Sequence, residues 1–168
     1  HLGHRNIGYL KCSTDIPNFI HRFDGFMKAR YTLEPELVYQ KPVVFTLPAN
    51  LKSASLEMKN ILAHLPADFE MPTCFLSDLD FIAIGTMIAL KEKGYAIPDD
   101  ISIIGYDDIE FSSVSSPSLT TLHLHQRTLA RTAVDLLIHK IENAPPCCSC
   151  IQIGSDLIIR DSVRDLRE

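Results

Sequence analysis

Carboxylate side chains follow two short apolar runs of the sequence, at points where buried strands are expected to end. Asp78 and Asp80 come directly after residues 73–77, and Asp107 comes shortly after residues 101–104. In a parallel sheet the carboxyl ends of the strands meet at one edge, where ligands commonly bind. Carboxylates at such an edge can each hold two neighbouring hydroxyl groups at fixed angles. The spacing therefore predicts a ligand site at this edge.

Further polar and aromatic residues could complete this site. Ser13 follows another apolar run, and Tyr106 comes just before the second acidic group. Arg22 lies at the edge of an apolar helical stripe, from which its guanidinium could face the carboxylates. Phe111 or Phe81 could stack against an apolar ring. Polar groups around an apolar floor are typical of a binding cleft rather than of catalysis. The alternative is that these are solvated loop acids and a surface arginine.

Strands and helices alternate along the chain, which predicts an α/β fold with a mostly parallel sheet. Gly94 is expected to end one helix, Gly105 to end a strand, and Asp80 to accept hydrogen bonds from the first amides of the helix 81–93. The predicted strands cover residues 6–10, 43–46, 73–77, 101–104, 119–122 and part of 151–159, and the predicted helices begin near residue 17 and cover 50–65, 81–93 and 128–142.

Composition sets limits on the class of protein. The chain has 168 residues, of which 46% are hydrophobic and 22% charged, as in an ordinary globular domain. Its net charge of −5 gives no electrostatic reason for this chain itself to bind nucleic acid. No apolar run is long enough to span a membrane, and no signal-peptide pattern is present. The chain starts at His1, so we expect a trimmed start or a fragment.

Cysteine usage indicates the compartment. There are five cysteines, an odd number, and three of them are crowded into residues 147–150. This pattern fits reduced thiols in the cytoplasm better than a secreted disulfide framework. We therefore predict a cytoplasmic protein.

Several ordered motifs resemble one family, the lactose/galactose-repressor (LacI/GalR) family of bacterial transcription regulators. The longest motif is "EKGYAIPDDISIIGYDDIEFSS", followed by "SPSLTT", within residues 91–121. The others are "LGHRNIGYL" near the start, "RFDGF" at residues 22–26, "FLSDLDFIAIGTMIALKEKG" at residues 75–94 and "DLIIRDSV" at residues 156–163. One position departs from the family pattern, since Leu79 stands where an effector-binding asparagine is usual.

The resemblance implies a periplasmic-binding-protein-like (type I) three-layer α/β/α sandwich, of which only part is present. It also implies a small effector, most often a sugar or related metabolite, that Arg22 and Asp107 would bind. A member of this family acts as a homodimer and binds operator DNA through a helix-turn-helix that this chain lacks. We expect no cofactor, no metal and no membrane association.

The resemblance also divides the chain into parts. Residues 1–118 and 151–163 would form the C-terminal subdomain, and residues 119–145 would form a crossover strand and helix that belong with an absent N-terminal subdomain. The helix 128–142 has an apolar face, with Leu129, Leu137 and Ile141 among its inward residues. Without that subdomain the face needs another cover, so we predict rearranged packing or exchange with a second copy.

Other functions remain open from the sequence. A solute-binding protein of a transporter would share the fold but would be exported. The Asp78-x-Asp80 motif matches a haloacid-dehalogenase-type phosphatase only superficially, because Phe81-Ile82 replaces the usual Gly-Thr. The Asp107-Asp108 pair could belong to a phospho-receiver domain, although it follows a late strand.

A metal site is a further alternative. Thiolates at residues 147–150 and the imidazoles of His123 and His125 are possible ligands. Neither group has a matching second pair at a familiar spacing, so a variable loop with free thiols and a polar strand face explain them as well.

Overall fold

The chain folds around one six-stranded sheet with strand order β2-β1-β3-β4-β5-β6. A computed structural model describes residues 2–33, 41–143 and 149–167. The first five strands of that order run parallel, and β6 pairs antiparallel with β5. The strands are β1 (Ile7–Cys12), β2 (Val44–Leu47), β3 (Cys74–Ser77), β4 (Ser102–Asp107), β5 (Thr120–Leu124) and β6 (Ser155–Ile158).

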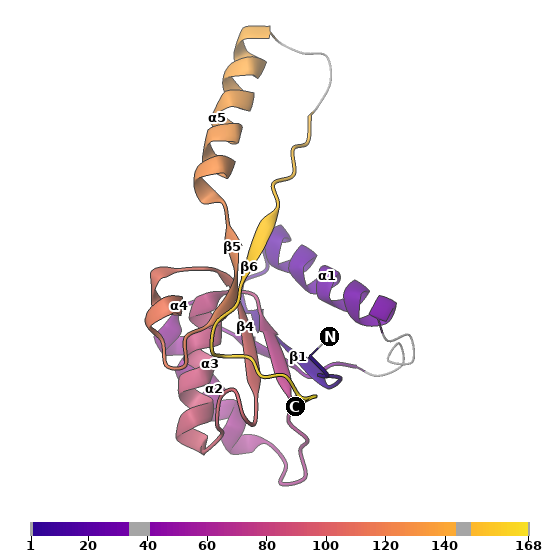
Figure 1. The fold of residues 1–168 in the computed structure, drawn as a ribbon, viewed down its shortest axis with the longest axis vertical. Helices are drawn as coiled ribbons and strands as arrows, with labels where there is room; N and C mark the ends of the chain where they lie inside the picture. The colour runs from indigo at the N-terminus through magenta and orange to yellow at the C-terminus, as the bar shows by residue number, and fades with distance from the viewer. Residues whose placement is uncertain (1, 34–40, 144–148, 168) are drawn as a thin grey trace.

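Helices cover both faces of the sheet, which confirms the predicted three-layer α/β fold. In Figure 1, α1 lies on one face, and α2 and α3 lie on the other. Alternate residues of β1 face these two layers, because Tyr9 packs against aromatic rings of α1 while Leu10 enters the opposite core. The helices are α1 (Pro17–Leu33), α2 (Leu51–His64), α3 (Asp80–Lys93), α4 (Glu110–Val114) and α5 (Gln126–Asn143).

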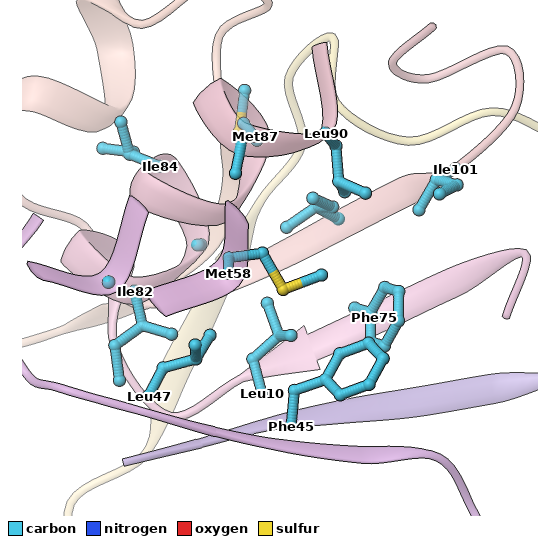
Figure 2. Close-up of a cluster of buried hydrophobic side chains, with 14 of the residues drawn as sticks. Leu10, Phe45, Leu47, Met58, Phe75, Ile82, Ile84, Met87, Leu90 and Ile101 are labelled. Carbon is cyan, nitrogen blue, oxygen red and sulfur yellow. The ribbon is translucent and has the colours of Figure 1, made fainter. Parts of the chain in front are cut away.

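The main core lies between the sheet and the pair α2–α3. Figure 2 shows Phe45 and Phe75 of the sheet close to Met58 of α2, with further side chains from α3. The two helices approach closely at Gly85, where an added Cβ would lie 2.7 Å from the Leu51 carbonyl oxygen. This core holds the strands rigidly, so that the loops at their carboxyl ends have fixed positions.

The structure corrects the predicted end of β4 and adds a short helix after it. Gly105 does not end the strand, which continues to Asp107. This position needs a glycine because the Asp80 side chain packs directly against its backbone, and an added Cβ would lie 2.0 Å from Oδ1 of Asp80. The following loop contains α4, a helix of one to two turns that was not predicted because it is too short to show a period.

The chain leaves the body of the molecule after β5 and returns through β6. β5 pairs with β4 from Thr120 to His123, so the part that stands apart begins after Leu124. Helix α5 projects from the body in Figure 1, and none of its residues is buried. The inward-facing residues predicted on this helix are therefore uncovered within this chain, with Ile141 73% exposed. Rearranged packing is not found in residues 2–33, 41–143 and 149–167, and exchange with a second copy stays a prediction.

The segment after β6 runs back over the body and is tied to two strands. Ser162 is fully buried. Its hydroxyl donates to the Ile103 carbonyl oxygen at 2.6 Å and accepts from the Thr120 amide at 2.9 Å. The Ile103 amide in turn donates to the Ser162 carbonyl oxygen. Residues near the end of the chain thus complete the sheet around β4 and β5.

Candidate functional site

Asp78 joins the carboxyl ends of β1 and β3. Its side chain is buried, and its two oxygens accept hydrogen bonds from the Tyr9 hydroxyl at 2.5 Å and the Cys12 amide at 2.6 Å. Burial raises the pKa of Asp78, although these hydrogen bonds act in the opposite direction. Burial and the Asp78 carboxylate both raise the pKa of Tyr9. Because both oxygens accept hydrogen bonds from β1, Asp78 links the ends of β1 and β3 and stabilises this edge of the sheet.

Arg22 reaches this edge from α1. Its guanidinium donates to the Asp78 carbonyl oxygen, and its other terminal nitrogen lies 3.7 Å from Oδ1 of Asp107. The same group lies over the Tyr106 ring, 3.6 Å from the ring centre, as in a cation–π contact. Phe19 adds a second aromatic neighbour. The structure therefore brings together four of the predicted residues, Arg22, Asp78, Tyr106 and Asp107.

Asp107 has an unusual electrostatic and backbone setting. Burial raises its pKa to about 6, while Arg22 lowers the pKa and the Asp80 carboxylate raises it. Its backbone φ is +117°, and the next residue, Asp108, has a φ of +53°. Two consecutive non-glycine residues at positive φ are rare and cost free energy, as is often seen at functional sites.

Asp80 lies below the site and not at its surface. It is 1% exposed, and its carboxylate accepts hydrogen bonds from the Ile109 amide (3.0 Å) and from the hydroxyls of Ser112 and Thr121 (2.6 Å each). The prediction that Asp80 caps α3 is wrong, because the cap position is Leu79 and has no side-chain cap bond. Asp80 instead holds the loop after β4 against β5.

The two remaining predicted residues are both exposed, Ser13 just after β1 and Phe111 on α4. Ser13 is exposed just beyond β1, where its amide donates to the Leu47 carbonyl oxygen at 2.8 Å. Phe111 is 57% exposed and contacts Phe81 on α3, with ring centres 6.1 Å apart. Because α3 covers the face opposite α1, α4 turns Phe111 away from the Arg22 side of the sheet.

Sequence reasoning missed a second ionic group beside Asp107. Oδ1 of Asp108 accepts a hydrogen bond from Arg160 at 2.7 Å, and its Oδ2 lies 2.9 Å from Nδ1 of His123. Burial would raise the pKa of Asp108, but these two partners lower it below its ordinary value. Arg160 lies within the closing motif "DLIIRDSV", but the motif does not indicate that Arg160 pairs with Asp108.

The two candidate histidines are engaged in ion pairs, and of the candidate thiolates only Cys150 is described, as an exposed free thiol. His123 pairs with Asp108, and His125 pairs with Asp156 at 3.1 Å. Within residues 2–33, 41–143 and 149–167, no group of three or more histidine, cysteine, aspartate or glutamate side chains could hold a metal ion. Cys147 and Cys148 fall outside these ranges. No helix in the described part of the chain could cross a membrane.

The raised pKa of Asp107 gives a test of this geometry. Its folded-state pKa of about 6 lies above the ordinary value of 3.8, so the folded chain keeps this proton when the unfolded chain has lost it. Ionisation of Asp107 therefore lowers stability as the pH rises, and the whole penalty is present above about pH 6. We expect Asp107→Asn to raise the free energy of unfolding by about 1–3 kcal/mol at pH 7.

The measurement is urea unfolding of both chains between about pH 4 and pH 7. The advantage of Asp107→Asn should disappear near the acidic end of this range, where the native carboxyl is protonated in both states. A variant less stable than the parent at neutral pH would show that attraction to Arg22 outweighs burial.

Comparison with known proteins places this chain in a family. Residues 1–163 match the family model of the periplasmic binding protein-like domain. The chain is 32% identical to the HTH-type transcriptional repressor PurR of Glaesserella parasuis, over 99% of this chain and 49% of the repressor. The chain spans about half the length of the curated relatives it matches.

Solved structures agree with this result. A LacI transcriptional regulator from Bacillus cereus superposes with a TM-score of 0.84 at 25% identity, over 98% of this chain and 56% of that one. The Lac repressor dimer bound to operator and the anti-inducer ONPF superposes with a TM-score of 0.83 at 27% identity, over 97% of this chain and 54% of that one.

Proposed function

Since this chain belongs to the LacI/GalR family and forms about half the length of its repressors, we propose that it is the ligand-sensing part of a DNA-binding transcription regulator. The whole protein binds operator DNA through a domain outside this chain and acts in the cytoplasm. A small effector, a sugar or a related metabolite, changes its affinity for the operator.

One observation carries this proposal: Arg22, Tyr106 and Asp107 meet at the carboxyl edge of a parallel sheet. The guanidinium and the carboxylate can hold neighbouring hydroxyls, and Tyr106 provides an apolar surface beside them. Ser13 is exposed at the same edge and is kept as a contact residue. Asp78 and Asp80 shape the floor of this site, because their oxygens are held by protein donors.

The effector would bind between two subdomains. The body of the chain, with β5 in its sheet, would form one of them, and the segment after Leu124 would belong with the other, which would cover the exposed face of α5. Closure of the two subdomains around an effector would change the spacing of the DNA-binding heads. This control requires the effector to bind one state of closure better than the other.

A homodimer is the assembly that we propose for the regulator. Large apolar side chains are exposed along α3 and α4, namely Phe81, Ile88, Phe111 and Val114. A group of exposed apolar residues of this kind is typical of an interface between protein chains. Phe111 therefore fits better in this contact than in the effector site.

The relatives favour a regulator over the other functions considered. The curated relatives are transcriptional repressors, whereas a solute-binding protein would be a component of a transporter. A phosphatase would need Asp78 and Asp80 free to attack and to protonate a substrate. Here each carboxylate is buried with both oxygens hydrogen-bonded, which supports a binding function.

The test uses the intact regulator and DNA selected by its own binding. Ribose, galactose, glucose and cellobiose serve as effector probes, and release or tightening of DNA is followed by fluorescence anisotropy. We expect Arg22→Ala and Asp107→Ala to raise the probe concentration needed for half response by about 10- to 100-fold, because each removes a charged hydrogen-bonding group. DNA affinity without probe should stay unchanged.

Arg164→Ala is the matched control, since Arg164 lies at the opposite edge of the sheet, near Asp99. Unchanged responses in both site variants would show that the site is wrongly assigned. A regulator that selects no DNA would contradict the function itself. Gel filtration of the same samples checks the dimer.

A further inference from the structure

The turn that presents Asp107 is held in an unfavourable backbone conformation. Asp107 and Asp108 both have positive φ, and the surroundings must supply the interactions that keep them there. The sheet provides part of this support, because Asp107 is the last residue of β4 and lies opposite His123 of β5. Beyond Asp107 the ladder ends, so the turn is held by the side chain of Asp108 and by the bond from the Ile109 amide to Asp80.

Arg160 and His123 hold that side chain from two directions. Each oxygen of Asp108 has its own partner, at 2.7 Å from Arg160 and 2.9 Å from His123. Arg160 is itself fixed at further points, since its second terminal nitrogen donates to the Leu119 carbonyl oxygen at 2.8 Å and its amide donates to the Thr120 hydroxyl at 2.9 Å. The side chains of Asp108 and Arg160 are 16% and 19% exposed, which makes this a half-buried, well-anchored ion pair.

We propose that Arg160 and His123 are positioning residues for the effector site: by holding Asp108 they fix the turn that presents Asp107 to Arg22 and to the ligand. Neither residue is a ligand contact in this inference. Their influence passes through one peptide unit, from the anchored Asp108 to Asp107. The inference rests on the proposed function for the statement that Asp107 binds an effector, but the geometry of the turn can be measured without one.

The two positioning residues come from the two strands that lead to and from α5. His123 is in β5, and Arg160 follows β6 by two residues, while β5 and β6 pair with each other up to Leu124 and Ser155. The acidic turn is therefore tied to the base of the projecting part of the chain. A structural ion pair that merely secures β6 is the competing explanation, and the two explanations differ in what happens to Asp107.

The experiment is a double-mutant cycle with Arg160→Gln and Asp108→Gly, in which the NMR readouts use this chain and sugar affinity is measured on the intact regulator. Glycine adopts positive φ without strain, so Asp108→Gly should form the turn without any anchor. The readouts are the φ angles at residues 107 and 108 from NMR couplings and chemical shifts, the NOE contacts between Arg22 and Tyr106, and the affinity for the four sugar probes.

Arg160→Gln alone should move Asp107 out of positive φ, remove the Arg22–Tyr106 contacts and weaken sugar binding at least 10-fold. In the Asp108→Gly background the same substitution should leave the contacts in place and change affinity by less than about 3-fold, because the turn no longer needs an anchor. His123→Ala removes only the second partner of Asp108. It serves as the milder variant if Arg160→Gln unfolds, with a smaller shift in the same direction.

Three outcomes separate the explanations. Retained φ angles and contacts in Arg160→Gln and His123→Ala would overturn the inference and leave a structural ion pair. An equal loss of contacts in both backgrounds would overturn it as well, because Arg160 would then act without Asp108. Expected NMR changes with no binding of any sugar probe would support the positioning roles and contradict the proposed ligand class.

Discussion

Replacing Asp80 with alanine is expected to lower the free energy of unfolding by about 3–5 kcal/mol. The carboxylate is 1% exposed and accepts from the Ile109 amide and from the hydroxyls of Ser112 and Thr121. Alanine leaves two buried hydroxyls and one partly buried amide without their acceptor, and each costs about 1–3 kcal/mol when it cannot reach water. The loop after β4 would also lose its attachment to β5.

Urea unfolding of the Asp80→Ala chain measures this loss of stability. Two further variants serve as the conservative substitution and the exposed control. Asp80→Asn keeps the shape and can satisfy an amide and two rotating hydroxyls, so it should lose less than half as much stability. Asp15→Ala removes a carboxylate that is 81% exposed and should change stability by less than about 0.5 kcal/mol. A small effect of Asp80→Ala would show that water replaces the carboxylate in this network.

Gly105→Ala is expected to lower the free energy of unfolding by about 2–4 kcal/mol, at or above the usual cost of overpacking a core. The new Cβ would lie 2.0 Å from Oδ1 of Asp80 and 2.7 Å from the Leu119 side chain. Asp80 cannot retreat without breaking its bond to Thr121. The substitution therefore combines a steric clash with damage to a buried polar network.

Gly25→Ala is the matched control for this substitution. Nothing lies within 4 Å of a Cβ at this position in α1, so alanine should stabilise the helix by about 0.5–1 kcal/mol. The double variant Gly105→Ala/Asp80→Ala should lose less stability than the sum of the single variants, because removing the carboxylate relieves the clash. Strict additivity in urea unfolding would contradict the assigned contact.

The architecture could be predicted because it depends on patterns that are local in the sequence. Short apolar runs bounded by turn residues marked β1 to β5 to within a few residues, apolar periodicity marked α1, α2 and α5, and Gly94 marked the end of α3. The parallel arrangement then placed Asp78 and Asp107 at one edge. Arg22 joined them because a helix after β1 must pack back onto the sheet, and the structure confirms that it does so.

The rest depends on contacts that no local pattern encodes. Arg160 and Asp108 are 52 positions apart, and only the completed sheet brings their side chains together. Asp80 resembles a helix cap in the sequence, but its carboxylate accepts hydrogen bonds from three donors in a later part of the chain instead. The apolar face of α5 was predicted, yet none of the residues that the structure describes covers it.

The tie formed by Ser162 has a consequence for the order of synthesis. A ribosome makes β1 to β4 and their helices long before it reaches Arg160 and Ser162, and domains begin to fold as they emerge. The core between the sheet and α2–α3 needs neither residue, whereas the buried hydroxyl that joins Ile103 to Thr120 comes from this late segment. The framework of the sheet is thus synthesised first, and the residues that complete it around β4 and β5 are added later.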